Sequence, residues 1–182
     1  YSGENEGSQW PGSRVISAQK AYTANAFSLN NLALSTANLY SAVQPGGSLF
    51  GLQESNPVDA EEAYEGDASD FGTDSDPMVG KRIGGVNVFG GGLALYDAEG
   101  NVVGGLGVSG DSSCADHNIG WRVRHSLKLD HVPGGVAADK SDNIIYDIKN
   151  GKSTGGFGHA KCGGTEDAVA KTLAKVTAPK KQ

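Results

Sequence analysis

The stretch GGLALYDAEGNVVGGLGVSGDSSCADHN, residues 91–118, carries the clearest structural pattern in the chain. Two apolar runs, Leu93–Tyr96 and Val102–Val108, flank a five-residue polar segment that contains Gly and Asn. Apolar runs of this length on either side of such a segment are typical of a β-hairpin. We therefore predict two antiparallel strands here and use them to place the rest of the chain.

The residues after the hairpin predict a helix over 112–129. Ser112 or Ser113 serves as the N-cap, and Asp116 lies in the first turn, where the helix dipole favours an acidic side chain. Apolar residues recur at every fourth position, and this spacing predicts a stripe that faces the core. The stripe consists of Ile119, Val123 and Leu127.

The same stretch contains a literal G-x-G-x-x-G at Gly105–Gly110, and Asp130 follows twenty residues after the last glycine. A dinucleotide fingerprint requires a parallel β-α-β unit with the acidic residue at the end of the second strand. Here the strand belongs to an antiparallel hairpin, and the helix leaves no room for a second buried strand before Asp130. The motif therefore does not predict an NAD site, although a helix N-terminus after Gly110 is able to hold an anion or a polar ligand group.

Other helices and one strand are predicted outside this stretch. Ser13 is an N-cap for an Ala-rich helix over residues 14–29. The remaining predicted elements are a short helix over 35–43, a strand over 142–148 and an amphipathic helix over 165–176. The acidic, aperiodic residues 54–80 are typical of an inserted surface loop. The sequence thus predicts one domain over residues 1–178 and a disordered tail over 179–182.

The composition excludes several classes of protein. The chain has 182 residues, which is enough for one domain with a core of its own. Its formal net charge of −6 argues against nucleic acid as a partner, because phosphate binding requires a basic face. No apolar run approaches the ~20 residues of a membrane span. The chain begins at Tyr1 without a Met, so its start carries no information about export.

The two cysteines, Cys114 and Cys162, lie far apart and form no C-x-x-C motif. They are compatible with a disulfide, with two inert buried thiols or with one reactive thiol. Both lie in small, polar, Gly-rich surroundings, which favours the disulfide. Such a bond implies an oxidising compartment, so we expect a secreted or periplasmic protein.

The hairpin and the helix after it resemble the GlcG/HbpS-like haem-binding family, also described as domain of unknown function 336. The segment SAQKAYTANAFS resembles that family's K-A-x-T-A helix, with Lys20 and Thr23 in the matching positions. Together these matches span most of residues 13–130. The segments DPMVGKR, CADHNIGWRVRH and HVPGG resemble a longer, Cys-containing branch of the family.

This resemblance implies an α+β fold with a profilin-like antiparallel sheet flanked by helices. It also implies symmetric homo-oligomers that bind haem or a related tetrapyrrole, with roles in haem sensing, storage or degradation. Members of the family normally begin with a helix and a hairpin that this sequence does not contain. An antiparallel sheet without those strands has an open edge, so we expect a separate N-terminal segment to complete it.

The predicted helix over 112–129 carries the main candidates for cofactor binding. His117 and Trp121 lie one turn apart, and a His followed by an aromatic residue is able to ligate iron and flank a porphyrin. The alternative is a His that hydrogen-bonds locally while Trp121 packs against a neighbour. Arg124, with Arg122 and Lys128, is a candidate for binding haem propionates, and the alternative is a solvated or interfacial side of the helix.

Two further candidates come from the resemblance, and one from position. Lys20 and Thr23 are expected to have polar roles in the pocket between helix and sheet, or else to make a cap or a buried hydrogen bond. His159 lies three residues before Cys162, so a disulfide to Cys114 would bring it toward the helix that carries His117.

The sequence therefore predicts a haem- or tetrapyrrole-binding protein. It contains no nucleophile elbow, no H-E-x-x-H and no C-x-x-C-H, so enzymatic activity has no support beyond the resemblance, and covalent c-type haem is excluded. Two alternatives remain open. One is an oligomeric structural subunit that kept the fold without the cofactor, and the other is a small-molecule enzyme that uses the pocket between helix and sheet.

Overall fold

The computed structural model describes residues 10–180, and the predicted hairpin lies at its centre. Strand β1 (Gly92–Tyr96) pairs antiparallel with β2 (Val102–Gly107), with Leu93 opposite Leu106. The turn is organised by Asp97, whose carboxylate accepts hydrogen bonds from the backbone N–H groups of Glu99 and Asn101 at 3.0 and 2.8 Å. The prediction of a hairpin is confirmed.

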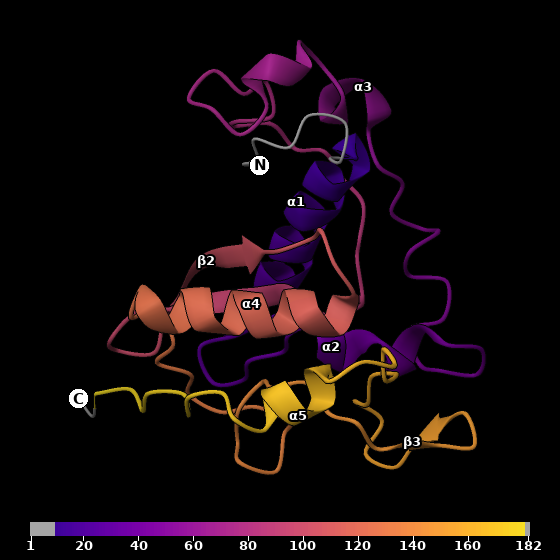
Figure 1. Ribbon diagram of the computed structural model, residues 1–182, viewed down its shortest axis with the longest axis vertical. Helices are drawn as coiled ribbons and strands as arrows, with labels where there is room; N and C mark the ends of the chain where they lie inside the picture. Colours follow the sequence, from indigo (N-terminus) through magenta and orange to yellow (C-terminus); the bar gives the residue numbers. More distant parts are fainter. Residues whose placement is uncertain (1–9, 181–182) are drawn as a thin grey trace.

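Helices cover both faces of the hairpin, which confirms the predicted α+β class (Figure 1). Helix α1 (Pro11–Phe27) packs so closely on β2 that a Cβ at Gly105 or Gly107 would lie within 2.2 Å of a helix carbonyl oxygen. Helix α4 (Ser113–Ser126) lies on the opposite face, where Gly120 approaches Leu93 and Val108. The first two glycines of the false dinucleotide motif, Gly105 and Gly107, therefore serve helix packing, whereas a Cβ at Gly110 would meet no atom within 4 Å.

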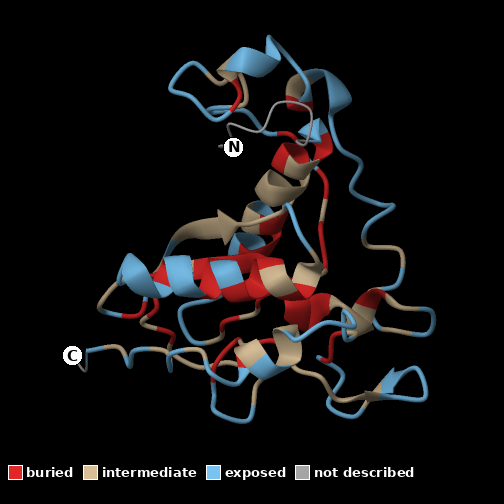
Figure 2. Cartoon of the chain, viewed as in Figure 1, coloured by how far each residue is buried: buried red, intermediate tan, exposed pale blue. Residues whose placement is uncertain are grey.

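The predicted orientation of α4 is wrong. Ile119, Val123 and Leu127 are 45%, 37% and 56% exposed, so the apolar stripe faces outward. Figure 2 shows exposed and buried residues side by side along this helix. Its buried side consists of Cys114, Asp116, His117, Asn118, Gly120, Trp121 and Arg124. The charged side chains Asp116 and Arg124 occupy the core face because each has an ion-pair partner there. The spacing of apolar residues in the sequence does not reveal such partners.

Several shorter elements depart from their predicted bounds. The helix expected over 35–43 is α2 (Thr36–Leu39) followed by a 3₁₀ turn, η1 (Ser41–Val43). The helix expected over 165–176 ends early, as α5 (Glu166–Ala170). The next residues run extended along α4, and the indole N–H of Trp121 donates to the carbonyl oxygen of Ala174 at 2.8 Å.

The strand predicted over 142–148 is almost wholly wrong. Only its last residue belongs to a strand, in the short hairpin of β3 (Ile148–Lys149) and β4 (Lys152–Ser153). The residues before it instead place their side chains and backbone groups against α2 and α4. Asn38 of α2, for example, donates to the carbonyl oxygen of Asn143 at 3.1 Å.

The acidic segment 54–80 lies beside the N-terminal end of α1, as Figure 1 shows, and contains α3 (Ala60–Ala63) and η2 (Ala68–Asp70). Buried Arg14 of α1 holds it through two hydrogen bonds: Nε donates to the Asp76 carboxylate at 3.0 Å, and Nη1 donates to the carbonyl oxygen of Ala63 at 2.7 Å. The hydrogen bond from Arg14 lowers the pKa of Asp76 far below its usual range. This part of the chain is therefore anchored to α1.

The two cysteines form a disulfide, as predicted, and it joins the first turn of α4 to the Gly-rich segment before α5. No helix within residues 10–180 is long and apolar enough to cross a membrane. Of the tail predicted over 179–182, residues 181–182 lie outside the described part of the chain. The backbone N–H of Lys180 donates to the carbonyl oxygen of Ala98 at 2.8 Å.

Candidate functional site

A buried ion pair joins α1 to the first turn of α4. The Lys20 Nζ lies 2.9 Å from a carboxylate oxygen of Asp116 and 2.8 Å from the carbonyl oxygen of Val108. Burial lowers the pKa of Lys20 and raises that of Asp116, and the attraction between the two groups opposes both shifts. Lys20 therefore acts as a bridge between α1, α4 and the end of the hairpin. The Lys20 Nζ also lies 5.0 Å from the ring centre of Phe89.

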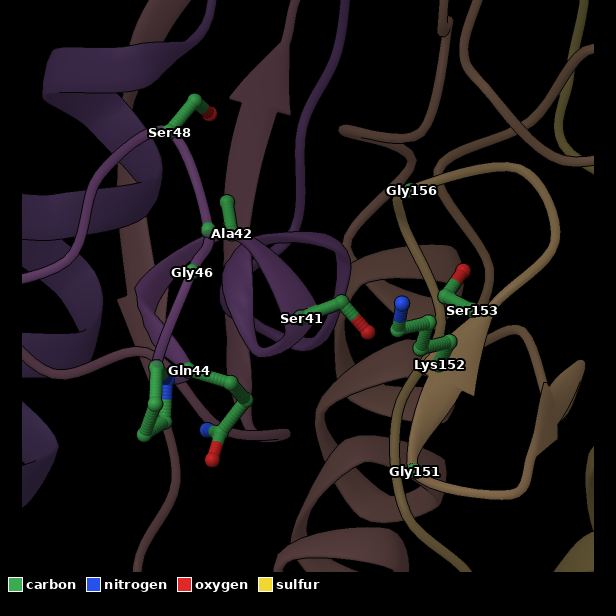
Figure 3. Close-up of a pocket in the computed structure, with 11 residues that line it drawn as sticks. Ser41, Ala42, Gln44, Gly46, Ser48, Gly151, Lys152, Ser153 and Gly156 are labelled. Atoms are coloured by element: carbon green, nitrogen blue, oxygen red, sulfur yellow. The ribbon is translucent and has the colours of Figure 1, made fainter.

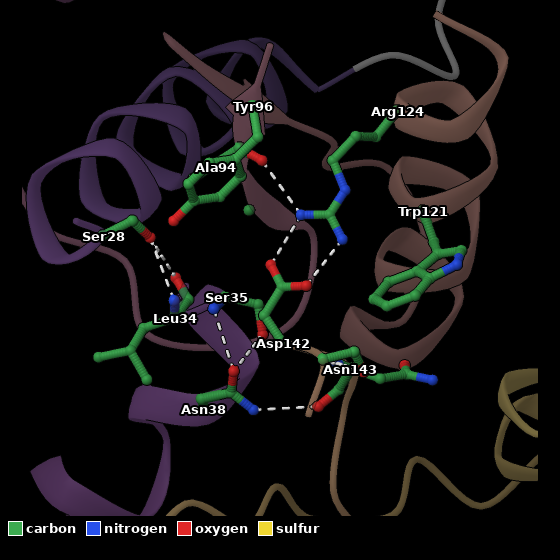
Figure 4. A network of polar contacts seen from close by, with 12 residues as sticks. Ser28, Leu34, Ser35, Asn38, Ala94, Tyr96, Trp121, Arg124, Asp142 and Asn143 are labelled. Atoms are coloured by element: carbon green, nitrogen blue, oxygen red, sulfur yellow. Dashed lines mark hydrogen bonds and ion pairs between the residues drawn. The ribbon is translucent and has the colours of Figure 1, made fainter. Parts of the chain in front are cut away.

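A second buried pair lies two turns further along α4 (Figure 4). Arg124 and Asp142 form two hydrogen bonds of 2.7 Å each, and both side chains are fully buried. The same guanidinium donates to the carbonyl oxygen of Ala94 in β1 at 3.1 Å and lies 4.8 Å from the centre of the Trp121 ring. Arg124 is thus at the centre of the core, and the alternative of a solvated or interfacial residue is wrong for this position.

His117 is completely buried between these two pairs. Its Nε2 lies 3.2 Å from both the Asn143 Oδ1 and the backbone N–H of Ile144, so one of these groups is its partner in either tautomer. Its Nδ1 has no partner within the described residues. Burial lowers the pKa of His117 to about 4, so the ring is neutral at pH 7. Its ring centre lies 5.9 Å from that of Trp121, as the sequence predicted for a pair one turn apart.

Thr23 makes a structural hydrogen bond. Its hydroxyl oxygen accepts from the backbone N–H of Asn87 at 3.1 Å, which fixes the segment before β1 against α1. Lys20 and Thr23 therefore lie on the same helix but face different partners. The structure gathers all five predicted cofactor residues inside the protein, where hydrogen bonds, ion pairs or aromatic contacts already engage them. They are Lys20, Thr23, His117, Trp121 and Arg124.

His159 lies against the disulfide, as expected from its position in the sequence. Its Nδ1 is 4.0 Å from the Cys114 sulfur and donates to the carbonyl oxygen of Ala160 at 2.6 Å. Its Nε2 accepts from the backbone N–H of Gly90 at 3.2 Å. Burial lowers the pKa of His159, so this ring is also held neutral. Both of its nitrogens are engaged, so the expected approach to the helix of His117 creates no second free ligand atom.

A histidine that the sequence reasoning did not select has a different environment. The Nδ1 of His125, in the last turn of α4, lies 2.7 Å from a carboxylate oxygen of buried Asp130. Since a carboxylate accepts and does not donate, Nδ1 carries a proton, and in the neutral ring Nε2 is the nitrogen with the lone pair. The His125 side chain is 47% exposed, and its Nε2 has no partner among residues 10–180. The sequence pattern that could have indicated this pair is an Asp five residues after a His near the end of the predicted helix.

This His–carboxylate arrangement is the one that proteins commonly use to orient a metal-binding imidazole. Arg122 and Lys128 lie three residues to either side of His125 and are both exposed. The end of α4 therefore presents an accessible nitrogen ligand next to two cations. His117, in contrast, is an enclosed neutral ring with one unpartnered nitrogen.

Comparison with known proteins identifies a family. Residues 4–122, more than half of the chain, match the family model described as haem degrading protein HbpS-like. Neither the curated proteins nor the solved structures contain a match to this chain.

The buried state of His117 predicts a pH dependence of folding. The unfolded chain binds a proton at this residue as the pH falls below about 6.5, whereas the folded chain does not until the pH reaches about 4. The stability that the neutral, buried His117 contributes to the fold is therefore present at pH 7 and is lost as the pH falls from about 6.5 to about 4. Between pH 7 and 4 we expect the free energy of unfolding of the unmodified protein to fall by about 2–3 kcal/mol more than that of His117→Asn.

Urea unfolding of both proteins across this pH range measures the difference. His131→Asn is the control, because His131 is only half-buried and its Nδ1 contacts the carbonyl oxygen of Ala178. Parallel pH curves for His117→Asn and the unmodified protein would show that His117 is not held neutral by burial.

Proposed function

Since the chain belongs to the HbpS-like family of haem-degrading proteins, we propose that it binds haem or a related tetrapyrrole. The family membership sets the class of ligand, and the α4 residues supply the means of binding it. When bound, haem would supply an iron centre that takes a histidine nitrogen as a ligand. Sensing, storage and degradation are the roles that such binding supports in this family.

The observation that carries the proposal is the pair formed by His125 and Asp130. Asp130 is buried and accepts a hydrogen bond from the Nδ1–H of His125, so the neutral imidazole is held in the tautomer that leaves Nε2 available. The exposed side chains of Arg122 and Lys128 are placed to neutralise carboxylates such as the two haem propionates. We therefore propose His125 as the first candidate for the residue that would ligate the haem iron.

His117 remains a second candidate, as the sequence predicted. Its neutral ring is the form that ligates a metal, its Nδ1 has no partner among the described residues, and the ring lies beside Trp121. Because the ring is fully buried, the residues that enclose it have to move before this nitrogen reaches an iron. Lys20, Thr23 and Arg124 then act by holding α1, α4 and the hairpin in place around the site.

A haem titration followed at the Soret band tests the function and assigns the ligand. We expect a saturable Soret band with the unmodified protein, and a shifted band with at least about tenfold weaker binding for His125→Ala. Asp130→Asn should shift the band in the same direction because it removes the group that orients the ring. The matched control is His131→Ala, which should behave as the unmodified protein does.

The possible outcomes separate the competing assignments. Loss of the band in His117→Ala, with no change in His125→Ala, would transfer the ligand to the enclosed ring. Absence of any Soret band in the intact protein would overturn the haem proposal. It would instead favour an oligomeric structural subunit that kept the fold without the cofactor.

We also propose that the protein is a secreted or periplasmic homo-oligomer whose sheet is extended by a further strand. The disulfide supports the compartment. The backbone N–H of Val108 donates to the carbonyl oxygen of Gly91 at 2.9 Å. This bond shows which residues of β2 direct their backbone N–H and C=O groups toward β1. By antiparallel geometry, Val103, Gly105 and Gly107 point their backbone groups away from β1. No backbone group in residues 10–180 pairs with them.

The two helices that pack on the hairpin also carry exposed apolar side chains. On α4 they are Ile119, Val123 and Leu127. On α1 the exposed side chain is Tyr22, at 61%, and the carbonyl oxygen of the preceding residue, Ala21, is the one that a Cβ at Gly105 would approach. An unpaired strand edge flanked by apolar side chains is a typical site for adding a strand from another segment. A separate N-terminal segment would fill the edge, and the α4 stripe would pack against a neighbouring copy.

Substitution on the α4 stripe tests the assembly. Val123→Asp should reduce the molar mass in light scattering coupled to size exclusion, because it places a charge in the proposed contact. Ser126→Asp, on the same exposed helix but outside the stripe, is the control and should keep the mass of the unmodified protein. In the assembled protein the amides of Gly105 and Gly107 should exchange hydrogen slowly.

A monomeric unmodified protein, or an unchanged mass for Val123→Asp, would contradict the proposed contact. Fast exchange at Gly105 and Gly107 in the assembled protein would contradict the added strand.

A further inference from the structure

A pocket of about 480 Å³, whose lining includes no residue of the buried ion pairs, lies between the turn that follows α2 and the hairpin of β3 and β4. Figure 3 shows the two walls of this pocket, with the side chains of Ser41 and Lys152 directed toward one another from opposite sides. The family resemblance assigns nothing to it. Its lining residues are polar or small: residues 41, 42 and 44–48 on one wall, and residues 151–153 and 156 on the other.

The β3–β4 wall carries positive charge. Asn150 and Gly151 have φ angles of 49° and 76°, as a two-residue type I′ turn requires. This tight turn places Lys149 directly opposite Lys152, with both side chains on the same face. Like charges in directly opposite positions repel, and no carboxylate among residues 10–180 forms an ion pair with either lysine. The hairpin therefore carries two lysines without an ion-pair partner, and one of them, Lys152, lines the pocket.

The opposite wall offers hydrogen-bond donors. The carbonyl oxygens of Ser41, Ala42 and Gln44 are engaged within the turn, by backbone N–H groups. The N–H groups of Gly46 and Ser48 have no partner among the described residues, and neither has the Ser48 hydroxyl. The wall thus presents free donors while its acceptors are largely occupied.

Three glycines border this pocket. A Cβ built at Gly46, Gly151 or Gly156 would meet no atom within 4 Å, so these positions border empty space. All three have φ angles between 76° and 82°, which side chains other than glycine adopt with strain. The Ser41 and Ser153 hydroxyls are fixed by hydrogen bonds to Gly158 O and to Asp147. The walls are therefore held in place before any ligand binds.

From this arrangement we propose that the pocket binds a small organic oxyanion, a phosphate ester or a polycarboxylate. The charge of Lys152 and the free N–H groups of Gly46 and Ser48 match the acceptors of such a ligand. Its volume lies in the range of sites for small molecules and exceeds what a single phosphate fills. The whole chain has a formal net charge of −6, which disfavours anions in general. Attraction for an anion therefore has to come from the groups that line this pocket.

Calorimetric titration with citrate and with inorganic phosphate, each at low ionic strength and without haem, tests the proposal. We expect saturable binding of at least one probe, weakened about tenfold in Lys152→Met because a charged hydrogen-bond partner is removed. Lys175→Met is the matched control, since Lys175 is an exposed lysine outside the pocket and its removal changes the net charge equally. The amide resonances of Gly46 and Ser48 should shift with the same saturation.

The probe that binds more tightly distinguishes a phosphate from a carboxylate ligand. The proposal is overturned if neither probe binds saturably at millimolar concentration. It is also overturned if Lys175→Met weakens binding as much as Lys152→Met, because the attraction would then be a property of net charge. Omitting haem keeps a failure here separate from a failure of the haem proposal.

Discussion

The buried ion pair of Arg124 and Asp142 is the constraint on which the rest of the structure depends. A guanidinium taken out of water is tolerated only where a carboxylate and further acceptors meet it. Asp142 supplies two hydrogen bonds, and the carbonyl oxygen of Ala94 supplies a third. One side chain of α4 therefore fixes both the central strand and a segment that lies 18 residues further along the chain.

The positions of other groups follow from this pair. Because Asp142 has to reach Arg124, the residues after it run across α2 and α4, and they form no continuous strand. Asn143 then lies against Asn38 and His117, and Ile144 covers the His117 ring. The polar core face of α4 forces its apolar side chains outward. The same constraint thus encloses His117 and exposes the surface that we propose for assembly.

The sequence predicted those parts of the fold that depend on local pattern. The hairpin followed from two apolar runs and a turn, and the disulfide from two cysteines in Gly-rich surroundings. The buried side of α4 was missed because spacing rules count Ile119, Val123 and Leu127 as core residues. Its true partners, Lys20 and Asp142, lie 96 residues from Asp116 and 18 residues from Arg124, and no local pattern reports such pairings. The Asn-Gly turn of β3 and β4 is a local signal that could have been used.

The same distinction applies to the candidate site. Residues chosen by family position, Lys20 and Thr23, lie in the core and hold the structure together. His125 was not among the residues predicted to bind the cofactor, and Asp130 had been considered only as an element of a dinucleotide motif. The residue that tertiary structure makes available for ligation is thus one that sequence spacing alone did not favour.

The most direct test of this account is the stability of Asp142→Asn, measured as the free energy of unfolding in urea at pH 7. The account predicts a loss of about 3–5 kcal/mol, because a fully buried Arg124 is left without a counter-charge. Arg124→Met combined with Asp142→Leu should recover most of that loss, since no buried charge remains. Asp167→Asn, which breaks the exposed pair with Lys161, should leave the free energy of unfolding nearly unchanged. A loss below about 1 kcal/mol for Asp142→Asn, comparable to that of a surface pair, would contradict the central role of this interaction.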